Sequence, residues 1–103
     1  MLEIIQNNWN AIKKVVKDKG SLSDISYRTW VEPLALENLT NGVLVICFPC
    51  NVDTAVEYVS NHYTKIFEEV LLDIYSVPIK VRFVASIANT NLREESNYKL
   101  PII

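Results

Sequence analysis

The sequence predicts an α+β fold of two layers, in which helices pack on a three-stranded sheet in the order helix, helix, strand, strand, helix, strand. The strongest observation is the pair Asn41-Gly42 between two strand-like runs, because both residues tolerate the positive φ of a tight hairpin. Stretches with apolar residues at helical spacing lie on both sides of this hairpin. An alternating run, residues 79–85, follows the last of them and predicts the third strand.

Residues 2–19 are expected to form the first helix, which Gly20 ends. A first apolar stripe at helical spacing comprises Leu2, Ile5, Trp9, Ile12 and Val16. A second stripe, displaced around the helix, comprises Ile4, Ala11 and Val15. Together they cover about half the circumference, more than the ~100° that one core needs. Either the helix is wedged between two elements of its own domain, or one stripe faces a partner.

The second helix is expected from residue 23 to the proline at position 33. Ser23 or Asp24 can cap its free backbone N–H groups. Tyr27 and Trp30 then fall on one face, which we expect to be buried. Pro33 cannot continue the helix, so the chain passes from here into a strand.

The hairpin joins a first strand that begins near Leu34 to a second strand at residues 43–48. The second strand is an unbroken run of β-branched, aliphatic and aromatic residues with one cysteine, which suggests that it is covered on both faces.

A long helix is expected from a cap at Asn51 or Asp53 to about Tyr75. Its predicted core face comprises Val52, Val56, Val59, Tyr63, Ile66, Phe67, Val70 and Ile74. Tyr58 and Leu72 lie on the opposite side and are expected to be exposed apolar groups. A right-handed crossover through this helix would keep the last strand parallel to the second. Residues 1–85 thus form one expected domain, and the polar, Asn-rich residues 86–103 a linker or tail.

Composition excludes some functions. The formal net charge of −2 argues against a dedicated nucleic-acid binder, whose footprint is usually basic. No segment approaches a membrane span, and the first residues lack the features of a signal peptide, so a cytoplasmic location is expected. No cofactor-binding motif is apparent, and none is expected.

Cys47-Phe-Pro-Cys50 is the one motif that favours an enzyme, because a helix N-terminus after a strand can stabilise a thiolate. A thiol–disulfide oxidoreductase is therefore an alternative. Two helices and a hairpin precede the motif, however, whereas redox motifs of this kind belong to a βαβ context. Zinc binding is less favoured still, since the two cysteines and His62 supply at most three ligands.

Residues 26–34, Ser-Tyr-Arg-Thr-Trp-Val-Glu-Pro-Leu, resemble the second helix of the N-terminal domain of DnaA, the bacterial chromosomal replication initiator. That family's pattern is Ser, an aromatic residue, two variable residues, Trp, an aliphatic residue, a variable residue and often Pro-Leu. Further landmarks follow in the family's order, namely Trp9, Pro49, Tyr58-Val59 and Tyr63. The resemblance covers residues 1–85 and implies a sandwich similar to KH domains.

The resemblance also implies a function. The family's N-terminal domain has no catalysis of its own; it self-associates weakly and contacts the replicative helicase or regulators of initiation. The family's ATPase and double-stranded-DNA-binding parts have no counterpart in this segment, so we expect it not to bind double-stranded DNA. Weak binding of single-stranded nucleic acid remains a further alternative. The KH mechanism needs a Gly-X-X-Gly loop, however, and the glycines are Gly20 and Gly42.

Partner contacts follow residue by residue. Trp9 matches the family's self-association tryptophan, and the second stripe of Ile4, Ala11 and Val15 is the other candidate on that helix. Ser26 stands where some members carry an acidic helicase-contact residue. Val52 is the nearest counterpart of a partner-contacting Phe, although no aromatic residue follows Pro49 here. Tyr58, expected on the outer side of the long helix, completes the set.

Overall fold

The computed structural model describes residues 1–49 and 53–85. The elements, in chain order, are α1 (Leu2–Asn7), α2 (Trp9–Lys19), α3 (Asp24–Ser26), the π-helical turn η1 (Tyr27–Val31), β1 (Ala35–Thr40), β2 (Val43–Phe48), α4 (Asp53–Tyr75) and β3 (Lys80–Ala85). The α+β class and the predicted order of helices and strands are confirmed. The predicted tail, 86–103, and the predicted roles of Cys50, Asn51 and Val52 lie outside the described residues.

The sheet has the order β1-β2-β3. β1 and β2 are antiparallel, and Asn41 and Gly42 between them have φ values of 54° and 78°, as the hairpin prediction requires. β2 and β3 are parallel, which confirms the crossover through α4. A register shift between Leu36 and Asn38 forms a β-bulge in β1.

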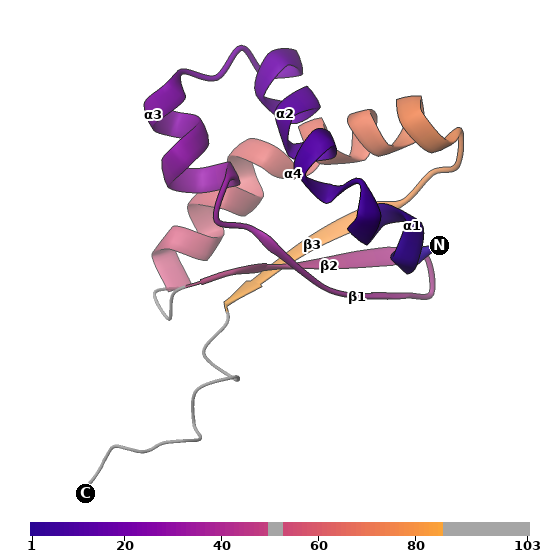
Figure 1. Ribbon diagram of the computed structural model, residues 1–103. Helices are drawn as coiled ribbons and strands as arrows, with labels where there is room; N and C mark the ends of the chain where they lie inside the picture. The colour runs from indigo at the N-terminus through magenta and orange to yellow at the C-terminus, as the bar shows by residue number, and fades with distance from the viewer. Residues whose placement is uncertain (50–52, 86–103) are drawn as a thin grey trace, which may run out of the picture.

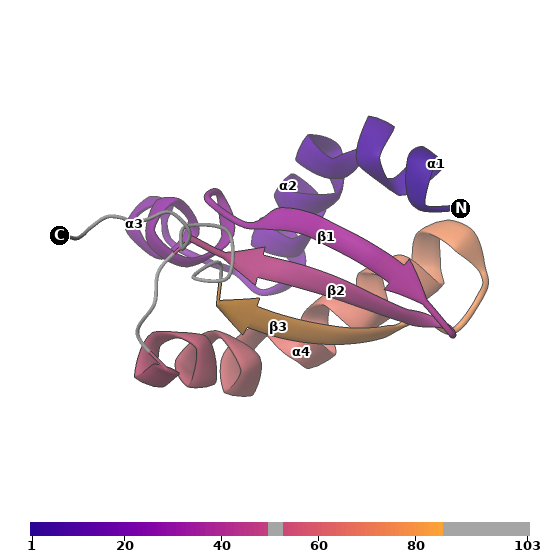
Figure 2. The same ribbon diagram turned by 90° about the horizontal axis from the view of Figure 1, so that it is seen from below.

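The helices of the described residues lie on one face of this sheet, so the domain has two layers (Figures 1 and 2). Leu44, Ile46 and Phe48 are buried, whereas Val43 and Val45, which alternate with them, are half-buried. The expectation that β2 is covered on both faces therefore holds only in part: on the second face Cys47 is buried, whereas Val43 and Val45 are not. β2 is apolar on both faces because it is the central strand, whose side chains are flanked by those of β1 and β3.

The single first helix that the sequence predicts is broken at Asn8. This residue has φ −112° and ψ 11°, and its side-chain Nδ2 donates a hydrogen bond to the carbonyl oxygen of Ile4 at 2.8 Å. Asparagine competes in this way with regular helical hydrogen bonds. The first apolar stripe nevertheless continues across the break, since Ile5, Trp9, Ile12 and Val16 all join the core.

The second helix begins as predicted, with the Ser23 hydroxyl accepting a hydrogen bond from the Ser26 backbone N–H at 3.1 Å. It then widens into a π-helical turn, in which the Glu32 N–H donates to the Tyr27 carbonyl oxygen at 2.8 Å. Nothing in the sequence pattern indicated this widening.

The long helix α4 buries most of the predicted face, including Val59, Tyr63, Phe67 and Val70. The prediction for Ile74 was wrong, because this side chain is exposed, and Leu71 is fully buried instead. Residues four apart drift around a helix, so after Val70 the buried face continues through Leu71 and the half-buried Tyr75 rather than through Ile74.

Candidate partner-contact surfaces

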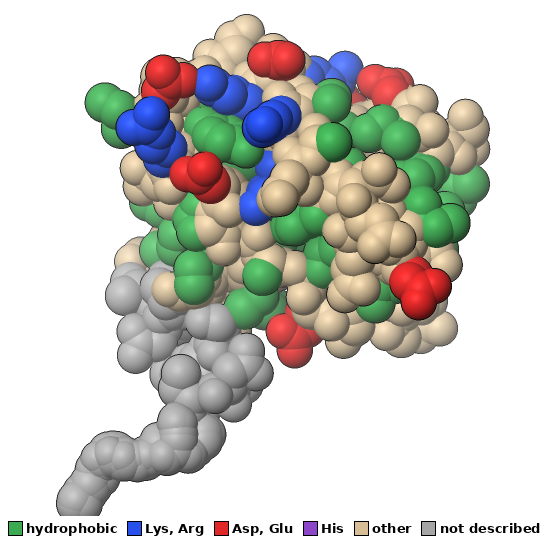
Figure 3. Space-filling model, viewed as in Figure 1, with side chains coloured by type: hydrophobic (Ala, Val, Ile, Leu, Met, Phe, Trp, Pro, Cys, Tyr) green, Lys and Arg blue, Asp and Glu red, His purple; other side chains and the backbone are tan. Residues whose placement is uncertain are grey.

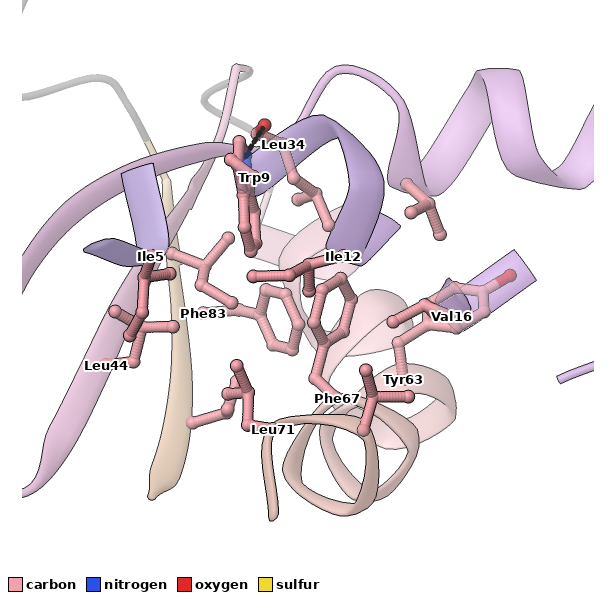
Figure 4. Close-up of a cluster of buried hydrophobic side chains, with 14 of the residues drawn as sticks. Ile5, Trp9, Ile12, Val16, Leu34, Leu44, Tyr63, Phe67, Leu71 and Phe83 are labelled. Carbon is pink, nitrogen blue, oxygen red and sulfur yellow. Dashed lines mark hydrogen bonds between the residues drawn. The ribbon is translucent and has the colours of Figure 1, made fainter. Parts of the chain in front are cut away.

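Trp9 lies in the core. Its side chain is 9% exposed, and its ring stacks on that of Phe67 with the centroids 5.6 Å apart. The indole Nε1–H donates a hydrogen bond to the carbonyl oxygen of Leu34 at 2.9 Å (Figure 4). The expectation that Trp9 faces a partner is therefore corrected: the ring is covered by α4, and its one polar group is satisfied inside the domain.

The second apolar stripe faces solvent. Ile4 is 52% and Val15 42% exposed, and Ala11 between them is exposed as well. Each of these residues precedes a core residue by one position, so they form a row beside the buried one, turned by about 100°. We call Ile4, Ala11 and Val15 the outer stripe. In Figure 3 apolar side chains reach the surface among polar ones around α1 and α2, whereas charged side chains gather toward α3.

A second surface is built from four aromatic rings in consecutive contact, which we call the aromatic ladder: Phe48, Trp30, Tyr58 and His62. Their successive centroids are 5.8, 4.5 and 3.9 Å apart. The ladder begins at buried Phe48 in β2, passes the half-buried Trp30 of η1, and ends on α4 at Tyr58, which is 39% exposed, and at exposed His62. It thus connects the core to solvent through continuous ring contact.

Trp30 does not have the fully buried position expected from its place on the second helix. Its ring is half-buried between Phe48 on one side and Tyr58 on the other. Because the turn that carries it is π-helical, each residue advances less around the axis than in an α-helix, which changes where the ring points.

Lys13 holds the end of this turn. Its side chain is buried, and its Nζ donates to the carbonyl oxygens of Glu32 at 2.6 Å and Leu34 at 3.3 Å. Burial lowers the pKa of Lys13 below its ordinary value, and the nearby Glu32 carboxylate offsets part of this shift. The ammonium group thus supplies a donor to the Glu32 carbonyl at the helix end and a second donor to the Leu34 carbonyl, which also accepts from Trp9.

His62 is fixed at the outer end of the ladder by its own helix. Its Nδ1 lies 2.8 Å from the carbonyl oxygen of Tyr58, one turn earlier. A carbonyl oxygen only accepts, so Nδ1–H is the donor of this hydrogen bond. The ring is thereby held flat against Tyr58.

The remaining predicted contact residues are distributed as follows. Ser26 is half-buried and lies one turn before Trp30 on the same helical segment. Tyr58 is exposed as expected, whereas Val52 lies outside the described residues. Sequence reasoning missed His62 as part of a surface. The signal was its spacing of four residues from Tyr58, which places two rings side by side on a helix.

The described residues show few features of a catalytic site. Cys47 is 6% exposed, within strand β2. Over residues 1–49 and 53–85 no group of three or more His, Cys, Asp or Glu side chains is placed to hold a metal ion. None of the helices described combines the length and the apolar character needed to cross a membrane.

The fold and these two surfaces define a two-layer α+β domain that exposes apolar and aromatic side chains on its helical layer. No known protein-family model matches the chain.

Proposed function

We propose that this chain is a non-catalytic protein–protein interaction module of the kind found at the N-terminus of the DnaA replication initiator. The observation that carries the proposal is the aromatic ladder, which brings Trp30, Tyr58 and His62 together at the surface. Ser26 and Tyr58, two of the residues for which the sequence suggests partner contact, lie on the two helical segments that form it. We assign this surface to the replicative helicase or a regulator of initiation.

The chemistry of the ladder suits such a contact. Aromatic rings that are already held in place lose little conformational entropy on binding and bury a large area, which is why they are frequent hot spots. Trp30 is held by Phe48 and Tyr58, and His62 by the Tyr58 carbonyl. A partner would therefore meet a preorganised surface of aromatic rings, with the exposed His62 ring at its edge.

Self-association is assigned to the outer stripe of Ile4, Ala11 and Val15, now that Trp9 lies in the core. A stripe along one pair of short helices buries less than a standard interface of ~1,600 Å², so the dimer should be weak, in the micromolar range or above. The same patch must serve both copies, which gives a twofold arrangement.

The competing hypothesis is a thiol oxidoreductase. Such an enzyme needs an accessible thiolate, whereas Cys47 is buried within a strand. Its burial supports a packing role for Cys47. Insulin-reduction turnover that disappears in Cys47→Ser or Cys50→Ser would establish the enzyme and overturn the interaction module.

The partner contact is tested by NMR titration of the ¹⁵N-labelled chain with a bacterial replicative helicase. We expect the signals of Trp30, Tyr58 and His62 to shift, and Tyr58→Ala to weaken the affinity at least tenfold, the loss typical of an aromatic anchor. Ile74→Ala is the matched control, because Ile74 is an exposed apolar residue elsewhere on α4. Equal affinities of the two variants would contradict the assignment.

Self-association is tested by sedimentation of the wild type and of Val15→Asp. The variant places a charge in the outer stripe and should be monomeric at all concentrations, while its circular dichroism stays unchanged. Asn10→Asp adds the same charge at an exposed position of α2 outside the stripe and should dimerise like the wild type. A wild type that remains monomeric at about millimolar concentration would exclude self-association of useful strength.

A further inference from the structure

Lys13 is a buried cation for which the proposed function gives no role. It is only 6% exposed, and the hydrogen bonds of its Nζ go to two main-chain carbonyl oxygens, those of Glu32 and Leu34. The Glu32 carboxylate offsets only part of the cost of burial, since the pKa of Lys13 stays below its ordinary value. An apolar side chain of similar length would avoid this cost, so stability alone does not explain a lysine at this position.

The two acceptors of Lys13 lie on either side of Pro33, where η1 ends. The backbone N–H of Glu32 closes the π-helical turn on the Tyr27 carbonyl oxygen at 2.8 Å. Pro33 has no N–H, so it cannot donate a further hydrogen bond to the turn. The carbonyl of Glu32 is among those that a helix end leaves without a helical partner, and Lys13 supplies its donor at 2.6 Å.

A second side chain of α2 holds the same junction, but at a different point. The indole Nε1–H of Trp9 donates to the Leu34 carbonyl oxygen at 2.9 Å. Trp9 and Lys13 are four residues apart and therefore neighbours on one face of the helix. Both donate to Leu34, which follows Pro33, whereas Lys13 also donates to Glu32, which ends the turn itself. The two side chains can therefore be tested separately.

The form of this turn determines where the Trp30 ring points. A π-helical turn advances each residue by less than the ~100° of an α-helix. If the Glu32 N–H donated to Arg28 instead, as in an α-helix, Trp30 would be turned relative to Glu32. Its present contacts, with Phe48 at 5.8 Å and Tyr58 at 4.5 Å between ring centroids, belong to the π-helical form.

We propose that Lys13 is a positioning residue for the aromatic ladder. Its ammonium group holds the Glu32 carbonyl and so keeps η1 in the π-helical form that places Trp30 between Phe48 and Tyr58. The value of this placement for partner binding rests on the proposed function, whereas the placement itself needs no partner. A partner then meets a ladder that is already assembled, and molecules whose turn is α-helical lower the apparent affinity in proportion to their number.

The placement is tested with Lys13→Met, which keeps a long side chain and removes the donor. Aromatic NMR spectra of the full chain without a partner should show displaced Trp30 and Tyr58 ring signals and a weakened nuclear Overhauser effect between the two rings. Lys14→Met, the same change at the next, exposed position of α2, should leave both as in the wild type. Unchanged ring signals in Lys13→Met would overturn the proposal. Global unfolding of this variant, seen by circular dichroism, would also overturn it, because Lys13 would then support the whole fold.

Trp9→Phe separates positioning from stability. It removes the indole donor to Leu34 and leaves Lys13 on the Glu32 carbonyl. We expect Trp9→Phe to lower the urea midpoint more than Lys13→Met does, yet to keep the Overhauser effect between the Trp30 and Tyr58 rings. Equal displacement of these ring signals in both variants would contradict the proposal, because any weakening of the junction would then be sufficient.

The consequence for binding is measured by titration with a bacterial replicative helicase. Lys13→Met should weaken the affinity about fivefold if about one fifth of the molecules keep the π-helical form, and the ring signals report that fraction independently. Displaced ring signals with wild-type affinity would overturn the role of Lys13 in binding. A wild type that does not bind the helicase would contradict the proposed function alone, because the ring signals test the placement of Trp30 without a partner.

Discussion

The two tryptophans lie in two stacks of aromatic rings that differ in where they end. The stack of Trp9 is closed: its ring stacks on Phe67, Phe67 meets Phe83 edge to face, and all three side chains are buried between α2, α4 and the sheet (Figure 4). The stack of Trp30 is open, because it begins at buried Phe48 and ends at exposed His62.

The polar groups of the two stacks are alike in their backbone partners but differ in exposure. The indole N–H of Trp9 donates to the Leu34 carbonyl, and Nδ1 of His62 lies 2.8 Å from the Tyr58 carbonyl oxygen, so a backbone acceptor fixes each stack. The open stack places its polar imidazole at the surface, whereas the indole N–H of the closed stack is buried. Similar ring contacts thus lie wholly inside the fold in one region and reach the surface in the other, according to which faces the neighbouring elements cover.

Lys13 connects the two regions. Its Nζ lies 5.8 Å from the centroid of the Trp9 ring and donates to the carbonyl of Glu32, at the end of the turn that carries Trp30. The two stacks are therefore held by the same side chain of α2. The following predictions, in order of decreasing effect, test whether one stack is structural and the other available for binding.

Trp9→Ala should produce the largest loss. Removing a buried ring that stacks on Phe67 leaves a cavity and should lower the free energy of unfolding by about 3–5 kcal/mol. Chemical denaturation followed by circular dichroism measures it. Trp9→Phe keeps a ring but removes the donor to Leu34, and should cost only about 1–2 kcal/mol. A loss below about 1 kcal/mol for Trp9→Ala would indicate that Trp9 lies at the surface and not in the core.

Trp30→Ala should cost less, roughly 1–2 kcal/mol, because the ring is half-buried and solvent already reaches one side. The same denaturation experiment measures it. A loss as large as that of Trp9→Ala would mean that the open stack is also core, and the comparison between the two regions would fail.

Lys13→Met should change stability by less than about 1 kcal/mol at neutral pH, since a buried ammonium carries a desolvation cost that its hydrogen bonds only offset. The pH dependence is more informative. The pKa of Lys13 in the folded chain is lower than its ordinary value of 10.5. At a pH between these two values, Lys13 is therefore more often protonated in the unfolded chain than in the folded chain. The wild type should therefore gain stability relative to Lys13→Met as the pH rises through this range.

Paired urea denaturations of the two proteins from pH 7 upward measure this difference. Because Tyr27 and Tyr63, whose pKa values burial raises, are present in both, their contributions cancel. The free energy of unfolding of the wild type minus that of Lys13→Met is the quantity compared. If it falls with rising pH, the ammonium of Lys13 stabilises the fold more than burial destabilises it.

Tyr58→Ala should have the smallest effect on stability, under about 1 kcal/mol, because the residue is already 39% exposed in the folded chain. The melting temperature should hardly change, while His62 loses its stacking partner. The chemical shifts of the His62 ring report that loss. A large fall in the melting temperature would make Tyr58 a structural residue and weaken its assignment to a partner.

The sequence by itself determined the local chemistry of the chain. Asn41 and Gly42 specify the hairpin, because few other pairs tolerate its φ values at so little cost. Ser23 specifies the helix start through its hydroxyl. The parallel pairing of β2 and β3 follows from the handedness of a crossover helix, which leaves little choice of topology. These features depend on a few neighbouring residues or on general chirality.

Only the tertiary structure decided which apolar side chains are covered. Two stripes on the first helix were both apolar, and the position of α4 buried Trp9 and left Ile4 and Val15 exposed. The aromatic ladder brings together residues from β2, η1 and α4, so no local pattern contains it. A helical period shows that side chains share a face but not what packs on that face, because packing depends on elements that are distant in sequence.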